Sequence, residues 1–486
     1  MKETTLSDIN NETVPNQTIP FISKISSTLL WALFIASIVA LVYYKLYSPE
    51  WNYKELFIIS DFTLLIWITV LFFSSIVSSY SKNYLTGFRY QKRFSILSFG
   101  FTVAVMLFVA SNHLIALLFS WFAMGFLMAK LIGVNTSWEE AKQAEKFSSR
   151  FFFSSFLLLA VGSLTLAYKI DTYILFELLI NLKNEETVLI ISALLIIIAA
   201  IIQSAIFPFH KWLLSAMTSP TPASALMHAG FVNGSGILLT LFAPLLLISQ
   251  TLWILFIVGG ITAIVAQFQK LIQVNVKHKL ACSTIAQMGF MIMQCGLGFF
   301  NAAVAHLILH GFYKAYLFLS SGEQVKQNSP NQTHKIKITF SQSIIVGIFG
   351  LLGAVLFAYL TGKTSLTDSS IFLTLIVAIT VGQATYNIVK ESNLSNLQKL
   401  VTSSVLFIVG IGIYAGFFNG VSRLMEDLPL IQAPQSLDPL HIVFGIIFLI
   451  GFFIMKLGLH TRSPWLYVQL LNLSQPYKKT IHYFKK

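Results

Sequence analysis

Two histidines and a lysine recur at every fourth position of an otherwise apolar stretch, AHLILHGFYKAYLFLSSG. They are His306, His310 and Lys314. Residues four apart in an α-helix share one face, so these side chains are expected to form a polar line about 12 Å long. A charge in hydrocarbon costs several kcal/mol, which requires the line to face protein or water. Histidine titrates near neutral pH, so the spacing favours a proton relay. The alternative is two histidines bonded to neighbouring helices and a lysine paired with a carboxylate.

A second polar stretch interrupts an apolar run at QSAIFPFHKWLLSAMTSPTPASALMHAG. Its candidate residues are Gln203, Pro208, Pro220, Pro222 and His228. Pro208 is expected to break the helix, and HKWLLSAM to form a short interfacial helix with Trp212 at headgroup level. Pro220 and Pro222 suit the first turn of the next helix, which carries His228 two turns in. Broken helices expose backbone dipoles at membrane depth, where ion sites form, but the spacing fits a structural elbow equally well.

A third stretch, QVNVKHKLACSTIAQMGFM, joins a basic loop to a helix with polar early turns. Lys277, His278 and Lys279 belong to the loop, and Ser283 and Thr284 to the helix. Positively charged loops are typical of the cytoplasmic side of a membrane, and small polar side chains join neighbouring helices. From the residues alone we interpret this stretch as structural.

Composition determines which elements must position these residues. Of the 486 residues, 56% are hydrophobic and 10% charged, and apolar runs of about 20 residues, the length of a membrane-spanning helix, recur throughout. We therefore predict an all-α polytopic membrane protein of about 14 spans. The expected spans are 24–45, 55–79, 94–110, 112–133, 150–168, 189–207, 221–247, 251–269, 281–299, 301–320, 338–361, 367–390, 400–419 and 439–459. Cys282 and Cys295 lack metal or disulfide spacing.

Charge predicts the orientation of the chain. We expect a polar N-terminal tail over 1–23, one transmembrane domain over 24–459 and a basic C-terminal tail over 460–486. Alternate loops and both tails hold most of the Lys and Arg, which predicts that both termini lie in the cytoplasm. We expect the chain to lie in the cell (inner) membrane, surrounded by lipid. We therefore attribute the net charge of +13 to these loops and expect no nucleic-acid partner. The basic loop Lys82–Arg93 either reflects this rule alone or docks an acidic partner.

These stretches, in this order, resemble the proton-conducting antiporter-type subunits of respiratory NADH dehydrogenase and of multi-subunit sodium/proton antiporters. The resemblance is carried by FPFHKWL…SPTPASALMHAG, by K-x-x-L-A-x-S-T-x-x-Q-x-G from Lys277 to Gly289, and by H-x-x-x-H-x-x-x-K. It implies a fold of two inverted repeats with broken helices. It also implies that a central hydrophilic axis moves protons. The residues it assigns to that axis are His228, His306, His310, Lys314 and, at the exit side, Lys363.

The chain departs from that family in the first half of the axis. The family's glutamate after tryptophan falls at Phe122, and its lysine in the broken helix falls at Gln203. A phenylalanine holds no proton and a glutamine no charge, so the first proton path is incomplete. Lys130, two turns from Phe122 on the same face, either replaces part of the lost charge or extends to the interface.

Within the family, HAGFVNGSGILL from His228 to Leu239 resembles the membrane subunits of DAB-type inorganic carbon transporters. The short stretch after the last predicted span fits the same subgroup. The resemblance implies a transporter subunit without enzyme activity or cofactor of its own. It would conduct cations to drive a large soluble, zinc-binding partner similar to a β-carbonic anhydrase. A respiratory NADH-quinone oxidoreductase subunit, a Na⁺/H⁺ antiporter subunit and a structural membrane anchor remain alternatives.

Overall fold

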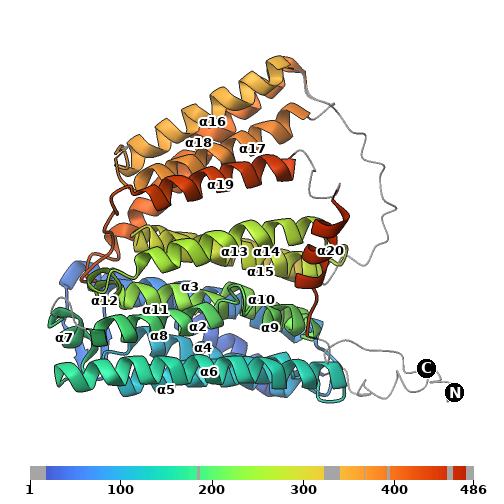
Figure 1. Ribbon diagram of the computed structural model, residues 1–486. Helices are drawn as coiled ribbons and strands as arrows, with labels where there is room; N and C mark the ends of the chain where they lie inside the picture. Colours follow the sequence, from blue (N-terminus) through green and yellow to red (C-terminus); the bar gives the residue numbers. More distant parts are fainter. Residues whose placement is uncertain are drawn as a thin grey trace, which may run out of the picture.

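The computed structural model describes residues 18–182, 187–321, 340–365, 367–390, 395–456 and 463–477. Long helices lie side by side with their axes roughly aligned (Figure 1). They are α2 (Phe21–Tyr47), α3 (Asp61–Tyr84), α4 (Gln91–Ala110), α5 (Leu114–Ile132), α6 (Glu139–Ile170), α8 (Thr187–Gln203), α13 (Leu252–Ile272), α14 (Val276–Gly296), α15 (Phe300–Ser321), α16 (Phe340–Thr361), α17 (Ser370–Lys390), α18 (Asn396–Arg423) and α19 (Pro439–Lys456). The 1–23 tail is described only from residue 18 and the 460–486 tail only over 463–477.

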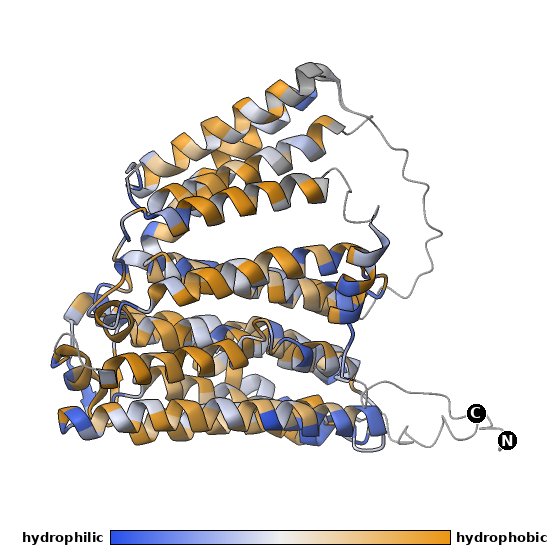
Figure 2. Cartoon of the chain, in the orientation of Figure 1, coloured by the Kyte–Doolittle hydropathy of each residue, from blue (hydrophilic) through white to orange (hydrophobic). Residues whose placement is uncertain are grey.

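Short elements complete the fold. They are β1 (Trp51–Tyr53), β2 (Phe57–Ile59), α7 (Leu175–Ile180), α9 (Lys211–Ser215), η2 (Ala216–Thr218), α10 (Thr221–Ala229), η3 (Phe231–Asn233), α11 (Gly234–Leu241), α12 (Ala243–Ile248) and α20 (Pro464–Leu473). In the described part of the chain, nine helices are long and apolar enough to span a membrane, and four more are shorter but apolar. Hydrophobic residues dominate the long helices (Figure 2). The predicted all-α membrane fold with broken helices is confirmed, whereas the count of 14 spans stays a prediction.

Two predicted boundaries are wrong because polar and hairpin-forming residues flank the apolar runs. The span expected over 55–79 begins only at Asp61, since β1 and β2 pair as an antiparallel hairpin. Ser60 caps the helix by accepting a hydrogen bond from the Thr63 N–H at 3.3 Å. The span expected over 150–168 begins at Glu139, because EEAKQAEKFSSR continues as helix ahead of the apolar residues.

The break predicted at Pro208 is present. Helix α8 ends at Gln203, and the chain passes through α9 and η2 before α10 begins with Pro220 at its N-cap and Pro222 in its first turn. The headgroup level predicted for Trp212 stays a prediction. Its indole is fully buried and its Nε1–H donates to the Ile202 carbonyl at 2.8 Å, so the ring packs inside the elbow.

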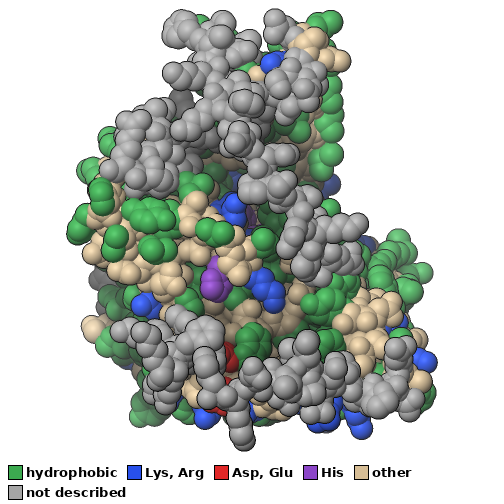
Figure 3. Space-filling view, turned by 90° about the vertical axis from the view of Figure 1, so that its right-hand side faces the viewer, with side chains coloured by type: hydrophobic (Ala, Val, Ile, Leu, Met, Phe, Trp, Pro, Cys, Tyr) green, Lys and Arg blue, Asp and Glu red, His purple; other side chains and the backbone are tan. Residues whose placement is uncertain are grey.

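The two ends of the bundle differ in charge. We call the end that carries the loops 85–90, 133–138 and 273–275 the basic face, because Lys82, Arg89, Lys92, Arg93 and Lys277 lie in or beside these loops. Figure 3 views it, with Lys, Arg and His side chains near its centre. The opposite face carries the hairpin and the loop 424–438. This division follows the predicted alternation of loops. The orientation of the termini stays a prediction.

Helices α13 and α14 approach each other backbone to backbone. A Cβ atom at Gly289 would lie 2.7 Å from the Ala263 nitrogen and 2.8 Å from the Gly259 carbonyl oxygen. A Cβ at Gly296 would lie 2.2 Å from the Phe256 nitrogen. Small residues at such crossings replace side-chain packing with close backbone contact. The final glycine of the K-x-x-L-A-x-S-T-x-x-Q-x-G motif therefore fixes α14 against α13, and α14 in turn packs on α15.

Candidate functional site

The polar line on α15 faces protein. Lys314 is 0% exposed, His310 is buried, and His306 is partly buried. The two imidazole rings stack with centroids 6.0 Å apart. The Lys314 Nζ donates to the Leu280 carbonyl oxygen of α14 at 2.9 Å. This geometry avoids lipid, as the cost of a charge in hydrocarbon requires.

His228 joins this line from the broken helix. It is fully buried on α10, and its ring stacks on Phe318 of α15 with centroids 4.3 Å apart. Phe318 lies one helical turn from Lys314, so His228 and Lys314 meet where α10 and α14 pack against α15.

The hydrogen-bond state of these groups suits proton exchange. Among the described residues, neither ring nitrogen of His228 or of His310 has a hydrogen-bond partner. The Nε2 atom of His306 also lacks one. None of the ion pairs in that part of the chain includes Lys314. An imidazole can take up a proton at one nitrogen and release one from the other. The alternative in which Lys314 is neutralised by a carboxylate partner has no support here.

Lys363 lies at the other end of α15, in the loop after α16. Its Nζ is 4.1 Å from the ring centroid of Phe299, directly before α15, and 3.2 Å from the Gln432 Oε1. The side chain is 6% exposed. Burial lowers the pKa of Lys363 to about 8, against the opposing attraction of Asp368. His306 lies about 10 Å further along α15, so Lys363 and the polar line share one helix.

The first-half positions do not join this group. Phe122 is 39% exposed on the outer face of α5 and packs on Phe126 and Phe156. Gln203 is buried at the end of α8, with its Nε2 unpartnered among the described residues. The Lys130 Nζ pairs with Glu145 of α6 at 2.5 Å. The charge of Lys130 is thus held by a carboxylate at the edge of the bundle.

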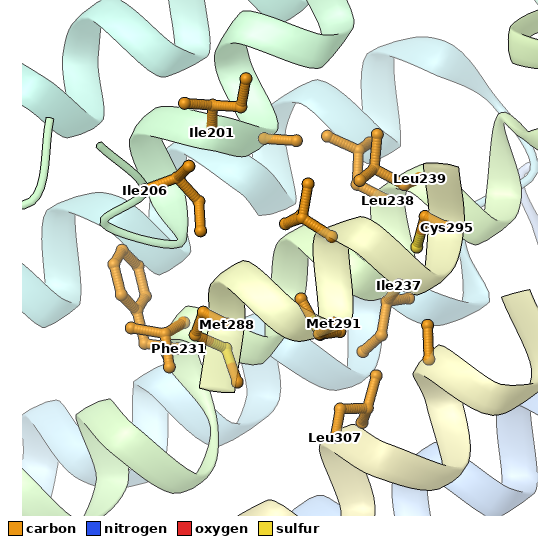
Figure 4. Close-up of a cluster of buried hydrophobic side chains, with 14 of the residues drawn as sticks. Ile201, Ile206, Phe231, Ile237, Leu238, Leu239, Met288, Met291, Cys295 and Leu307 are labelled. Carbon is orange, nitrogen blue, oxygen red and sulfur yellow. The ribbon is translucent and has the colours of Figure 1, made fainter. Parts of the chain in front are cut away.

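Apolar side chains fill the space between the broken helix and α14. Figure 4 shows Ile201 from the end of α8, Ile206 from the break after it, Ile237 from α11, and Met288 and Met291 from α14 gathered around one cluster. All of them are buried. This packing forms an apolar layer between the broken helix and α14, which opposes the passage of charge through that layer.

Sequence reasoning missed three partners of the axis. The Leu280 carbonyl that holds Lys314 also accepts from Thr284, a residue that we interpreted as structural. No pattern pointed to Gln432 or Phe299. Gln432 reaches Lys363 from the loop 424–438 and Phe299 from the segment before α15, so only folding brings them together. Within the described residues, no group of three or more His, Cys, Asp or Glu side chains is placed to hold a metal ion.

The sequence matches the family model described as NADH:quinone oxidoreductase/Mrp antiporter, transmembrane, over residues 111–386. This range includes the broken helix, the polar line and Lys363. The chain belongs to this family. Its resemblance to antiporter-type subunits is thereby confirmed, and membership agrees with the polytopic helical architecture.

Several relatives carry names of transporter or respiratory subunits. A probable inorganic carbon transporter subunit DabB1 of Halothiobacillus neapolitanus is 36% identical over 58% of this chain and 52% of the relative. A probable inorganic carbon transporter subunit DabB of Hydrogenovibrio crunogenus is 30% identical over 84% and 78%. An NADH-quinone oxidoreductase subunit L of Rickettsia typhi is 32% identical over 61% and 48%. The chain spans only about half the length of the first and third of these relatives.

A solved structure shares the fold. One chain of the Mrp complex from Dietzia sp. DQ12-45-1b superimposes on our structure with a TM-score of 0.56 and 19% sequence identity. The match covers 94% of our chain and 51% of the Mrp chain. At this identity the likeness concerns the fold alone. It places the helices described above within an antiporter-like architecture.

Proposed function

We propose that this chain is the membrane subunit of an energy-coupled uptake complex for inorganic carbon, CO₂ or bicarbonate. Cations, in our proposal protons, run down their gradient through the axis of His228, His310, His306 and Lys314, with Lys363 at the exit. The movement drives a zinc-binding, β-carbonic-anhydrase-like soluble partner. The identity to DabB-named relatives supports the carbon assignment, and membership in the antiporter family supports cation conduction.

The observation that carries the proposal is the buried Lys314 without an ion-pair partner among the described residues. Its ammonium is held by one carbonyl oxygen and lies within electrostatic range of two histidines. Holding an ammonium at membrane depth is costly, and such groups mark ion pathways and proton relays in membrane proteins. An unpaired lysine beside unpartnered imidazoles is suited to taking up and releasing protons.

The available energy is sufficient for the task. One elementary charge that crosses 100 mV releases about 2.3 kcal/mol. At full coupling this supports roughly a 50-fold accumulation per charge, because about 1.4 kcal/mol corresponds to a factor of ten.

A growth assay tests this function. A carbonic-anhydrase-deficient host in ordinary air would express the chain with its soluble partner as wild type, Lys314→Ala and the exposed control Lys142→Ala. We expect wild type and Lys142→Ala to restore growth and carbon uptake. Lys314→Ala should lose uptake at least tenfold while the complex still assembles. Normal uptake by Lys314→Ala would refute the role of the axis, and no rescue by wild type would refute the carbon assignment.

A second candidate function is a sodium/proton antiporter or respiratory subunit, favoured by the fold shared with the Mrp complex. Co-purification of flavin and iron–sulfur subunits would support the respiratory alternative. If alanine is tolerated at Lys314, His306 and His310 together, the chain is a structural membrane anchor.

A further inference from the structure

A pocket of about 290 Å³ opens on the basic face. Four segments that are distant in sequence line it: the loop before α6 and its first turn, the α9–η2 elbow, the start of α14 and the segment after α20. The residues that matter here are Trp138, Glu140, Thr218, Asn275, Lys277 and Pro476. Trp138 and Asn275 are exposed, so the mouth of the pocket meets solvent.

Lys277 connects this pocket to the interior. Its Nζ donates to the carbonyl oxygen of Ser219 at 2.9 Å, directly before Pro220 at the N-cap of α10. The Lys277 side chain is partly buried, whereas that of Lys279 is exposed. In the described part of the chain, no ion pair includes Lys277.

The contact continues inward to the axis. The Ser219 carbonyl bonded by Lys277 directly precedes α10, which carries His228 two turns further on. The His228 ring stacks on Phe318, one helical turn from Lys314 on α15. A line of polar groups therefore runs from solvent to the centre of the bundle, in the order pocket, Lys277, His228 and Lys314.

We propose that this pocket is the entrance through which protons from the basic face reach the axis, and that Lys277 passes them to His228. Each step moves one proton. The Lys277 ammonium releases it, a ring nitrogen of His228 takes it up, and Lys277 regains one from hydronium or a buffer acid in the pocket. This inference deepens the proposed function and rests on cation conduction by the chain, but not on carbon being the substrate.

Proteoliposomes of the complete complex test it, with pyranine inside and a potassium diffusion potential as driving force. The variants are Lys277→Gln, which keeps a donor for the Ser219 carbonyl but cannot exchange a proton, and the exposed control Lys279→Gln. We expect Lys277→Gln to lower the proton flux at least tenfold and Lys279→Gln to leave it within twofold. Thermal unfolding of both complexes should match wild type, which separates conduction from folding.

Blocking the pocket gives an independent readout. Thr218→Cys lines the pocket, whereas Ser137→Cys lies on the same face outside its lining. The native Cys282 and Cys295 are fully buried, so they should not react with a membrane-impermeant thiosulfonate. The reagent should lower the flux at least fivefold in Thr218→Cys and leave Ser137→Cys unchanged.

Wild-type flux in a folded Lys277→Gln complex, together with no effect of blocking at position 218, would overturn the entrance while leaving the proposed function intact. A wild-type complex that conducts no protons would refute cation conduction and this inference together. A complex that conducts protons but does not accumulate inorganic carbon would refute the carbon assignment alone.

Discussion

Three lysines show how the surroundings of a residue determine whether its charge is neutralised, buried or functional. Lys130 pairs with Glu145 at the edge of the bundle, Lys314 is bonded to a carbonyl oxygen at its centre, and Lys363 lies on the ring of Phe299 near the opposite face. A partly exposed pair contributes little, whereas a buried cation without a carboxylate is costly and retained for function.

Lys130→Ala should therefore be nearly neutral. Its side chain is 36% exposed and that of Glu145 is 15% exposed, so loss of the pair should change stability by no more than about 1 kcal/mol. Thermal unfolding in detergent and the uptake assay measure both effects. A tenfold loss of uptake would show that Lys130 does replace the missing first-half charge.

Lys363 should make stability depend on pH. Its pKa is lowered by burial from 10.5 to about 8, so between these values the unfolded chain binds more protons than the folded one. Stability then rises with pH through this window. Relative to Lys363→Met, wild type should gain up to about 3 kcal/mol between pH 7.5 and 11. Parallel pH curves for the two proteins, measured by thermal unfolding, would contradict this assignment.

Helix α14 is the element that organises the site. It provides Lys277 toward the pocket, the Leu280 carbonyl toward Lys314, and Gly289 toward α13. One motif thus combines a polar function at its start with close helix packing at its end. The placement of Lys314 depends on α14 keeping its distance from α13.

Gly289→Val should separate these helices. The new side chain would meet backbone atoms of α13, which cannot rotate away, so we expect a loss of about 3 kcal/mol in stability. Gly412→Ala is the matched control, because nothing lies within 4 Å of a Cβ there. Thermal unfolding of both variants compares them. Equal midpoints of thermal unfolding for the two variants would show that the α13–α14 crossing accommodates the new side chain without loss of stability.

Over the described residues, positive and negative side chains are concentrated at opposite ends of the molecule. The basic face carries the Lys82–Arg93 loop and the pocket, whereas Asp61, Asp427 and Asp438 lie at the opposite face. An acidic soluble partner would be attracted to the basic face, close to the proposed entrance.

Reversing charge at Lys92 and Arg93 to Glu should release such a partner. Lys54→Glu, on the opposite face, is the control. We expect at least tenfold weaker co-purification for the double variant, an unchanged melting midpoint of the membrane subunit, and a stronger effect at low salt. Full retention of the partner would mean that these charges serve membrane orientation alone.

The sequence by itself determined the all-α membrane class, the break at Pro208 and the polar line on α15, because these follow from local periodicity and from the backbone chemistry of proline. It also determined that Phe122 and Gln203 carry no charge. Tertiary structure alone decided that Trp212 is buried, that Lys130 pairs with Glu145, and that the carbonyl oxygens of Ser219 and Leu280 hold Lys277 and Lys314. The physical reason is that a backbone carbonyl oxygen has no sequence signature, and its partner is chosen only when helices from distant parts of the chain pack together.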